Sequence, residues 1–145
     1  DLFNQLGIAI LFSQAIIKQF NKQKKGGNLI HISSIQGIST PKFEHYLDTD
    51  MVSPIEYSAI KSGIISMVRY LAKYYKGKDI RVNCLSPGGI FNNQPSSFLE
   101  KYKNSCNSKG MLDPSDIVET LKFLLSDKSE FINGQNIIID DGWTL

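Results

Sequence analysis

Tyr57-Ser58-Ala59-Ile60-Lys61 is the stretch around which the rest of this sequence is organised. It lies near the start of residues 56–75, whose apolar pattern predicts a long helix. Residues four apart share one helix face, so Tyr57 and Lys61 are expected to be neighbours. An ammonium beside a phenol favours the phenolate and lowers the pKa of the phenol. Such a pair can exchange a proton near neutral pH, although the same spacing also occurs on solvated helix surfaces.

Two predicted strands flank this helix and end in residues suited to a site. Upstream, Leu29–Ile32 predicts a buried parallel strand that stops at Ser33-Ser34. Downstream, Ile80–Leu85 predicts a second strand, followed by Ser86-Pro87-Gly88-Gly89. Ligands bind beyond the carboxyl ends of parallel strands, so Ser34 is placed to donate a hydrogen bond to a substrate carbonyl. A turn or helix-capping serine remains the alternative at that position. His31 is expected to be a buried, hydrogen-bonded strand residue.

The remaining elements continue an alternation of helices and strands. Residues 3–24 predict a helix that is apolar on more than one face, as in helices buried on more than one side. Asp113-Pro114 predicts the cap and first position of another helix, and residues 136–139 predict the last strand. That helix is expected to run to about residue 126, with these apolar side chains facing inward: Ile117, Leu121, Leu124 and Leu125.

Composition limits the classes of protein that fit. The 145 residues suffice for one domain or part of one, and 41% are hydrophobic, enough for a packed core. A net charge of +2 is too small to imply nucleic-acid binding, and no apolar run is long enough to predict a membrane span. The two cysteines form no disulfide framework and suggest reduced thiols in a cytoplasmic protein. We expect no metal site.

Four motifs in a fixed order resemble the short-chain dehydrogenase/reductase family. They are the Ser-x-x-Gly at residues 34–37, the Tyr-x-x-x-Lys at 57–61, the Arg-Val-Asn-x-x-x-Pro-Gly at 81–88, and the tail at 133–143. The resemblance implies an α/β fold, the C-terminal half of a doubly wound, Rossmann-type parallel sheet flanked by helices. The glycine-rich phosphate loop of such sheets is absent, so residues 1–145 are expected to be a single partial domain without its nucleotide-binding half.

The resemblance also implies an enzyme that uses NAD or NADP to transfer hydride to or from a small-molecule carbonyl or alcohol. Tyr57 would be the acid/base, Lys61 would assist it and bind the nicotinamide ribose, and Ser34 would orient the substrate. Many family members hold the lysine through an asparagine on the preceding helix, where Gln5 aligns here. Four further positions would face the cofactor: Pro87, Gly88, Ile90 and Asn92. This chain alone is expected to be inactive.

Residues 39–55 form a longer connection than the family usually has, and we expect it to contact the substrate because it joins Ser34 to Tyr57. The sequence of this connection resembles that of bacterial oxidoreductases of flagellin modification, which belong to pathways of nonulosonic, sialic-acid-like sugars. Two alternatives stay open: a 3-oxoacyl-type ketoreductase, and a non-catalytic half-domain that only pairs with a partner. The resemblance further implies a homodimer or homotetramer through the helices at 3–24 and 55–76.

Overall fold

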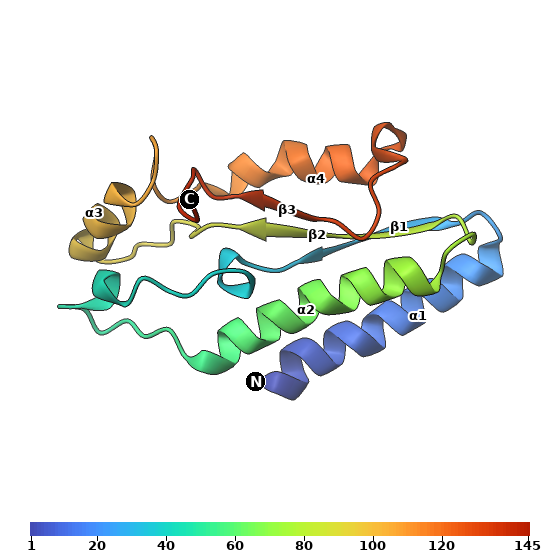
Figure 1. Ribbon diagram of the computed structural model, residues 1–145, viewed down its shortest axis with the longest axis horizontal. Coiled ribbons are helices and arrows are strands. Elements are labelled where there is room, and N and C mark those ends of the chain that lie inside the picture. Colours follow the sequence, from blue (N-terminus) through green and yellow to red (C-terminus); the bar gives the residue numbers. More distant parts are fainter.

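The computed structural model describes residues 1–145 and contains a three-stranded parallel sheet between two layers of helices (Figure 1). The strands are β1 (Gly27–Ile32), β2 (Ile80–Pro87) and β3 (Asn136–Ile139), and β2 lies in the centre. Both strand pairs are parallel, with Gly27 opposite Ile80 and Cys84 opposite Asn136. The predicted α/β class and parallel sheet are therefore confirmed.

Helices cover both faces of this sheet. Figure 1 shows α1 (Ile8–Gln23) and α2 (Ile55–Tyr74) side by side on one face, and α4 (Val118–Leu125) on the other. A π-helical turn precedes α1 at Phe3–Gly7, and a 3₁₀ turn precedes α4 at Pro114–Ile117. The short α3 (Ser96–Asn104) lies with residues 39–55 beyond the carboxyl ends of the strands. Three further 3₁₀ turns are short: Ile35–Gly37, Phe43–Tyr46 and Asp127–Ser129.

The main core lies between α2 and the sheet. Four apolar side chains of α2 form a buried stripe: Ile60, Ile64, Val68 and Leu71. Ile60 is fully inaccessible and packs in the same cluster as the equally inaccessible Val82 of the sheet. From α1, Ile17 completes the same cluster. His31 is also buried, and its Nε2 lies 2.8 Å from Ser13 Oγ, which confirms the prediction of a hydrogen-bonded strand histidine. Burial of this stripe fixes the face that α2 turns toward the strands.

Leu125 was predicted to face inward, and that prediction is wrong. Its side chain is 51% exposed, whereas the adjacent Leu124 is fully buried. Because α4 ends at Leu125 and covers only one face of a three-stranded sheet, one leucine of the pair fills the space beneath the helix and the other points outward. The outer face of α1 is also apolar and exposed, notably at Leu11 and Phe12. No helix combines the length and apolar character needed to cross a membrane.

Two serines and a glycine dock α2 onto the turn that follows β1. Ser33 Oγ donates a 2.8 Å hydrogen bond to the Lys61 carbonyl, and Ser62 Oγ donates one of 2.8 Å to the Gly37 carbonyl. A Cβ added at Gly37 would lie 2.9 Å from the Lys61 carbonyl oxygen and 2.8 Å from the Ile65 side chain. Only glycine permits this approach, which brings the turn of α2 containing Lys61 beside Ser34.

Gly37→Ala is expected to destabilise the protein by about 1–3 kcal/mol, because the new methyl group must displace a helix backbone that is already anchored. Urea unfolding followed by circular dichroism measures the change. Gly7→Ala is the matched control: its Cβ meets only the ring of Phe3, which is largely exposed and free to shift. Alanine favours helical backbone there, so this variant should unfold at an equal or higher midpoint. Equal midpoints for all three proteins would contradict the proposed constraint.

Candidate active site

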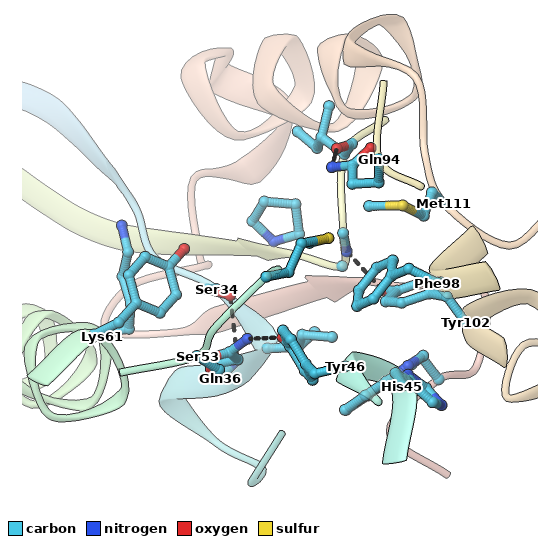
Figure 2. A pocket seen from close by; sticks show the side chains of 18 of the residues that line it. Ser34, Gln36, His45, Tyr46, Ser53, Lys61, Gln94, Phe98, Tyr102 and Met111 are labelled. Atoms are coloured by element: carbon cyan, nitrogen blue, oxygen red, sulfur yellow. Dashed lines mark hydrogen bonds between the residues drawn. The ribbon is translucent and has the colours of Figure 1, made fainter. Parts of the chain in front are cut away.

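A pocket of about 480 Å³ opens beyond the carboxyl ends of β1 and β2. Its walls come from these strand ends, the first turns of α2, residues 45–54, α3 and the C-terminal tail. Figure 2 shows Lys61 at one end of the pocket and Phe98 and Tyr102 at the other. Both the volume and the mixed apolar and polar lining are typical of a small-molecule site.

Tyr57, Lys61 and Ser34 line this one pocket. The Lys61 Nζ lies 5.3 Å from the centre of the Tyr57 ring, so the two side chains are neighbours on α2 as their spacing predicts. Burial lowers the pKa of Lys61, and the nearby Cys84 opposes this shift. Neither the Lys61 ammonium nor the Tyr57 hydroxyl is hydrogen-bonded within the chain. Both polar groups therefore remain available to a ligand in the pocket.

Ser34 caps a turn and also lines the pocket, so the capping position that the sequence offered as the alternative does not remove it from the site. Its Oγ accepts a 3.2 Å hydrogen bond from the Gln36 backbone N–H, which caps the 3₁₀ turn after β1. The same side chain lines the pocket and is only 8% exposed. A serine hydroxyl that accepts from a backbone amide still has its own proton to donate. The cap therefore orients Ser34 without using its donor.

The positions predicted to face a cofactor divide into two groups. Pro87, Gly88 and Ile90 line the pocket, and the Gly88 amide donates a 2.7 Å hydrogen bond to the Ile139 carbonyl, which extends the β2–β3 pairing. Asn92 is exposed and lies outside the pocket, and its backbone amide donates to Gln94 Oε1 at 2.7 Å. Gln94, two residues further along the chain, does line the pocket.

Gln5 lies apart from the residues that line the pocket. It is exposed in the π-helical turn before α1, next to Leu6, which packs near Gly63 of α2. Its side chain makes no hydrogen bond within the chain. The proposed connection between Gln5 and Lys61 therefore stays a prediction.

The pocket also contains residues that the motifs did not identify. Gln36 follows Ser34 by two positions, and Tyr46 and Ser53 belong to the long connection at 39–55. That connection was expected to reach the site, and it does line the pocket. Its individual contacts could not be assigned from the sequence because they depend on how an irregular segment folds back. The adjoining far wall is mainly aromatic and apolar and comes from distant parts of the chain: Phe98, Tyr102, Met111 and Trp143.

Polar contacts hold the 39–55 segment against α3 and the C-terminal tail. Lys42 Nζ donates a 3.1 Å hydrogen bond to the Trp143 carbonyl and lies 4.6 Å from the centre of its indole ring. His45 Nε2 lies 3.0 Å from Ser105 Oγ, and burial lowers the pKa of this histidine, which favours its neutral form at pH 7. The Trp143 ring stacks on Tyr102, with ring centres 5.8 Å apart. The far wall of the pocket is thus assembled from three segments.

Two aspartates at the end of β3 anchor the C-terminal tail. Asp140 accepts hydrogen bonds from Thr144 N and Oγ1 at 2.8 and 2.6 Å. Asp141 accepts from the backbone amides of residues 108–110 at 2.6–3.0 Å and from Ser108 Oγ at 2.7 Å. These bonds, led by the one from Gly110, lower the pKa of Asp141 to about 2. No cluster of three or more His, Cys, Asp or Glu side chains could hold a metal ion.

Comparison with known protein families identifies the family to which this fold and these motifs belong. A family model described as "Enoyl-(Acyl carrier protein) reductase" matches residues 5–144, nearly the whole chain, and represents short-chain dehydrogenases and reductases. The chain belongs to the short-chain dehydrogenase/reductase family. The resemblance drawn from the ordered serine, tyrosine, lysine and proline-glycine motifs is therefore confirmed.

Among relatives, the chain is 54% identical over 140 residues to the post-translational flagellin modification protein A of Campylobacter coli. That alignment covers 97% of this chain and 54% of the relative. The chain is also 31% identical over 134 residues to the 3-oxoacyl-[acyl-carrier-protein] reductase of Thermotoga maritima, covering 90% of the chain and 50% of that protein. The chain thus spans about half the length of the curated relatives it matches.

Solved structures agree with this assignment. A short-chain dehydrogenase from Leptospira borgpetersenii with bound NAD⁺ superposes with a TM-score of 0.91 at 39% identity, over 97% of this chain and 54% of that one. A 4-hydroxyisoleucine dehydrogenase in complex with NADH and succinate superposes with a TM-score of 0.81 at 28% identity, over 97% of this chain and 55% of that one. These neighbours confirm a Rossmann-type short-chain dehydrogenase fold.

The depressed pKa of Asp141 predicts how the 108–110 loop responds to acid. The folded pKa of about 2 lies below the usual 3.8, so the stabilisation is fully present above about pH 4 and is lost as the pH falls toward 2. Hydrogen exchange at the 108–110 amides, corrected for intrinsic rates, should show this transition. Asp141→Asn should lower protection already at pH 7 and abolish the transition. The Gly88 amide, bonded to a backbone carbonyl, is the internal control. Unchanged protection in the variant would contradict the assignment.

Proposed function

We propose that this chain supplies the catalytic half of an NAD(P)-dependent oxidoreductase that transfers hydride between a nicotinamide and a carbonyl or alcohol. The observation that carries the proposal is that Ser34, Tyr57 and Lys61 line one pocket beside Pro87 and Gly88. The comparisons support the class of reaction, because the Thermotoga maritima relative is a reductase and two dehydrogenase neighbours were solved with NAD⁺ or NADH. NAD or NADP is accordingly the proposed cofactor.

Three residues of this chain would carry out the proton exchange, the binding of the ribose and the orientation of the substrate. Tyr57 exchanges a proton with the substrate oxygen, which is the general acid/base step. Lys61 lies beside it with a free ammonium, able to stabilise phenolate character and to bind ribose hydroxyls. Ser34 donates a hydrogen bond to the substrate oxygen as charge develops there. When bound, the nicotinamide supplies or accepts the hydride.

The remaining predicted residues would have supporting roles. Pro87, Gly88 and Ile90 would bind the cofactor, because they line the pocket at and just beyond the end of β2. Asn92 would bind a more distant part of the cofactor, because it is exposed just past that wall. Gln5 would hold Lys61 indirectly, through water.

The proposed substrate is a sugar processed during flagellin modification. The 54% identity to the Campylobacter coli protein supports this choice. The lining of the pocket supports it as well, since residues from the 39–55 segment add polar groups to an apolar wall. A 3-oxoacyl ketoreductase is the second candidate, favoured by the 31% identity to the Thermotoga maritima reductase.

Residues 1–145 are proposed to be the C-terminal half of a larger dinucleotide-binding domain and to be inactive alone. Two observations support this: the matched relatives are about twice as long, and the edge strand β1 pairs only with β2. If no nucleotide-binding half exists, the non-catalytic partner interpretation becomes the better one. The exposed apolar face of α1 supports pairing of two or four copies through α1 and α2. We place the protein in the cytoplasm, consistent with its two free cysteines.

Tyr57→Phe in the full-length protein is expected to lower kcat by roughly 10²- to 10⁴-fold, because phenylalanine can neither accept the proton of an alcohol nor donate one to a carbonyl. Absorbance of NAD(P)H during oxidation of a secondary alcohol measures turnover, and circular dichroism checks the fold. Tyr74→Phe is the matched control, since Tyr74 is an exposed tyrosine of the same helix and lies outside the pocket. It should keep the parent rate. Turnover that survives Tyr57→Phe would overturn the catalytic assignment.

A further inference from the structure

One side of the pocket carries a chain of hydrogen-bonded neutral groups that the proposed reaction does not use. Ser53 Oγ donates a 2.8 Å hydrogen bond to Gln36 Oε1, and Gln36 Nε2 donates one of 3.4 Å to the Tyr46 hydroxyl. Figure 2 shows Gln36 and Tyr46 lying between Lys61 and the far aromatic wall, joined by this bond. We call Gln36, Tyr46 and Ser53 the amide array. It orients one carboxamide from both sides inside the pocket.

The amide array presents both donors and acceptors to a ligand. Because the Tyr46 hydroxyl accepts from Gln36, its own proton is free to point into the pocket. Gln36 keeps its second Nε2 proton and a second lone pair on Oε1. A hydroxyl group both donates and accepts, so it matches this mixture. A carboxylate or phosphate only accepts hydrogen bonds and leaves the acceptors of the array unpaired.

The distribution of charged side chains around the pocket also favours an uncharged ligand. Lys61 is the only lysine, arginine, aspartate or glutamate in the lining, and it lies at the end occupied by Tyr57. His45, buried and bonded to Ser105, is the one other titratable base there. The charged groups near the far wall lie outside the lining and have partners there. Lys42 donates to the Trp143 carbonyl, Lys101 donates to the Leu47 carbonyl and lies 3.7 Å from Asp48, and Asp140 accepts from Thr144. No charged side chain lines the pocket at the end away from Lys61, so an anionic substrate group there would be buried without a cation in the lining to pair with it.

The apolar wall lies beside the amide array, where Phe98 packs edge-on against Tyr46 with ring centres 5.2 Å apart, and it suits a ring with hydroxyl groups on its edge. Phe98 and Tyr102 both line the pocket and lie with ring centres 5.9 Å apart. The Tyr102 hydroxyl accepts a 2.6 Å bond from the Gly89 amide, so its ring is held in place and presents mainly carbon to the pocket. A carbohydrate ring has C–H faces for such a wall and hydroxyls for the array.

We propose that Gln36, held by Ser53 and Tyr46, selects an uncharged, hydroxyl-bearing substrate, a neutral sugar rather than a sugar acid or sugar phosphate, at the end of the pocket away from Lys61. The proposal rests on the proposed hydride-transfer function, because it assumes that the substrate carbon reacts beside Tyr57. It adds a specificity-determining residue and the charge state of the substrate.

The test uses the full-length protein and four probes with NAD⁺ and NADP⁺: glucose, glucuronate, glucose 6-phosphate and the plain ring alcohol cyclohexanol. Gln36→Met keeps the length of the side chain and removes the amide. Gln135→Met is the matched control, because Gln135 is exposed and its side chain bonds only the nearby Asn133 carbonyl. Saturation-transfer NMR measures binding of each sugar independently of turnover.

The parent protein should favour glucose over both charged sugars by at least about tenfold in kcat/KM and in binding, the equivalent of roughly one well-formed hydrogen bond or more. Gln36→Met should raise KM for glucose by about tenfold with kcat little changed, and should leave cyclohexanol kinetics unaltered. Gln135→Met should behave as the parent.

Equal or better use of glucuronate or glucose 6-phosphate by the parent would overturn the proposal, as would equal effects of Gln36→Met on glucose and cyclohexanol. If cyclohexanol is oxidised in a Tyr57-dependent way but glucose is not preferred over the charged sugars, the proposed selectivity is wrong and the proposed function is still supported. If no probe is oxidised, the proposed function fails, and NMR binding that distinguishes glucose from glucuronate through Gln36 still supports the array.

Discussion

The hydrogen bond from Ser33 Oγ to the Lys61 carbonyl, 2.8 Å long, is the interaction on which the geometry of the pocket depends. It joins the end of β1 to the turn of α2 that carries Lys61, and the absence of a side chain at Gly37 lets the two backbones approach. The bond uses the backbone of Lys61 and leaves its ammonium free. Ser34 and Tyr57 are separated by the long 39–55 connection, yet this bond and the buried face of α2 bring them to one pocket.

The far side of the pocket is built differently, from irregular segments that hold one another. Lys42 reaches Trp143, His45 reaches Ser105, and Asp141 holds the 108–110 loop. Loops positioned on a rigid sheet are where related enzymes vary their substrates, because such segments tolerate change that the core does not. The division matches the proposed roles, in which the strand ends and α2 carry out the reaction and the irregular segments select the substrate.

The sequence predicted the strands, the long helices and the grouping of Ser34, Tyr57 and Lys61, because each depends on local periodicity or on parallel strands ending at one edge. It did not identify Gln36, Tyr46 or Ser53 individually. Their placement depends on how residues 39–55 fold back, which no periodicity encodes. Leu125 was misplaced for a related reason, since which of two adjacent leucines is buried depends on where α4 ends over the sheet. Gln5 and Asn92 were aligned by family pattern, and both lie outside the pocket lining.

The central claim is that the pocket beyond β1 and β2 is where hydride is transferred. A crystal structure of the full-length protein with NAD(P)H bound tests this most directly. We expect the nicotinamide ring beside Pro87 and Gly88, ribose hydroxyls within hydrogen-bond distance of Lys61 Nζ, and the Tyr57 hydroxyl facing the reactive carbon of the ring. A dinucleotide bound with its nicotinamide away from Tyr57 and Lys61 would contradict it.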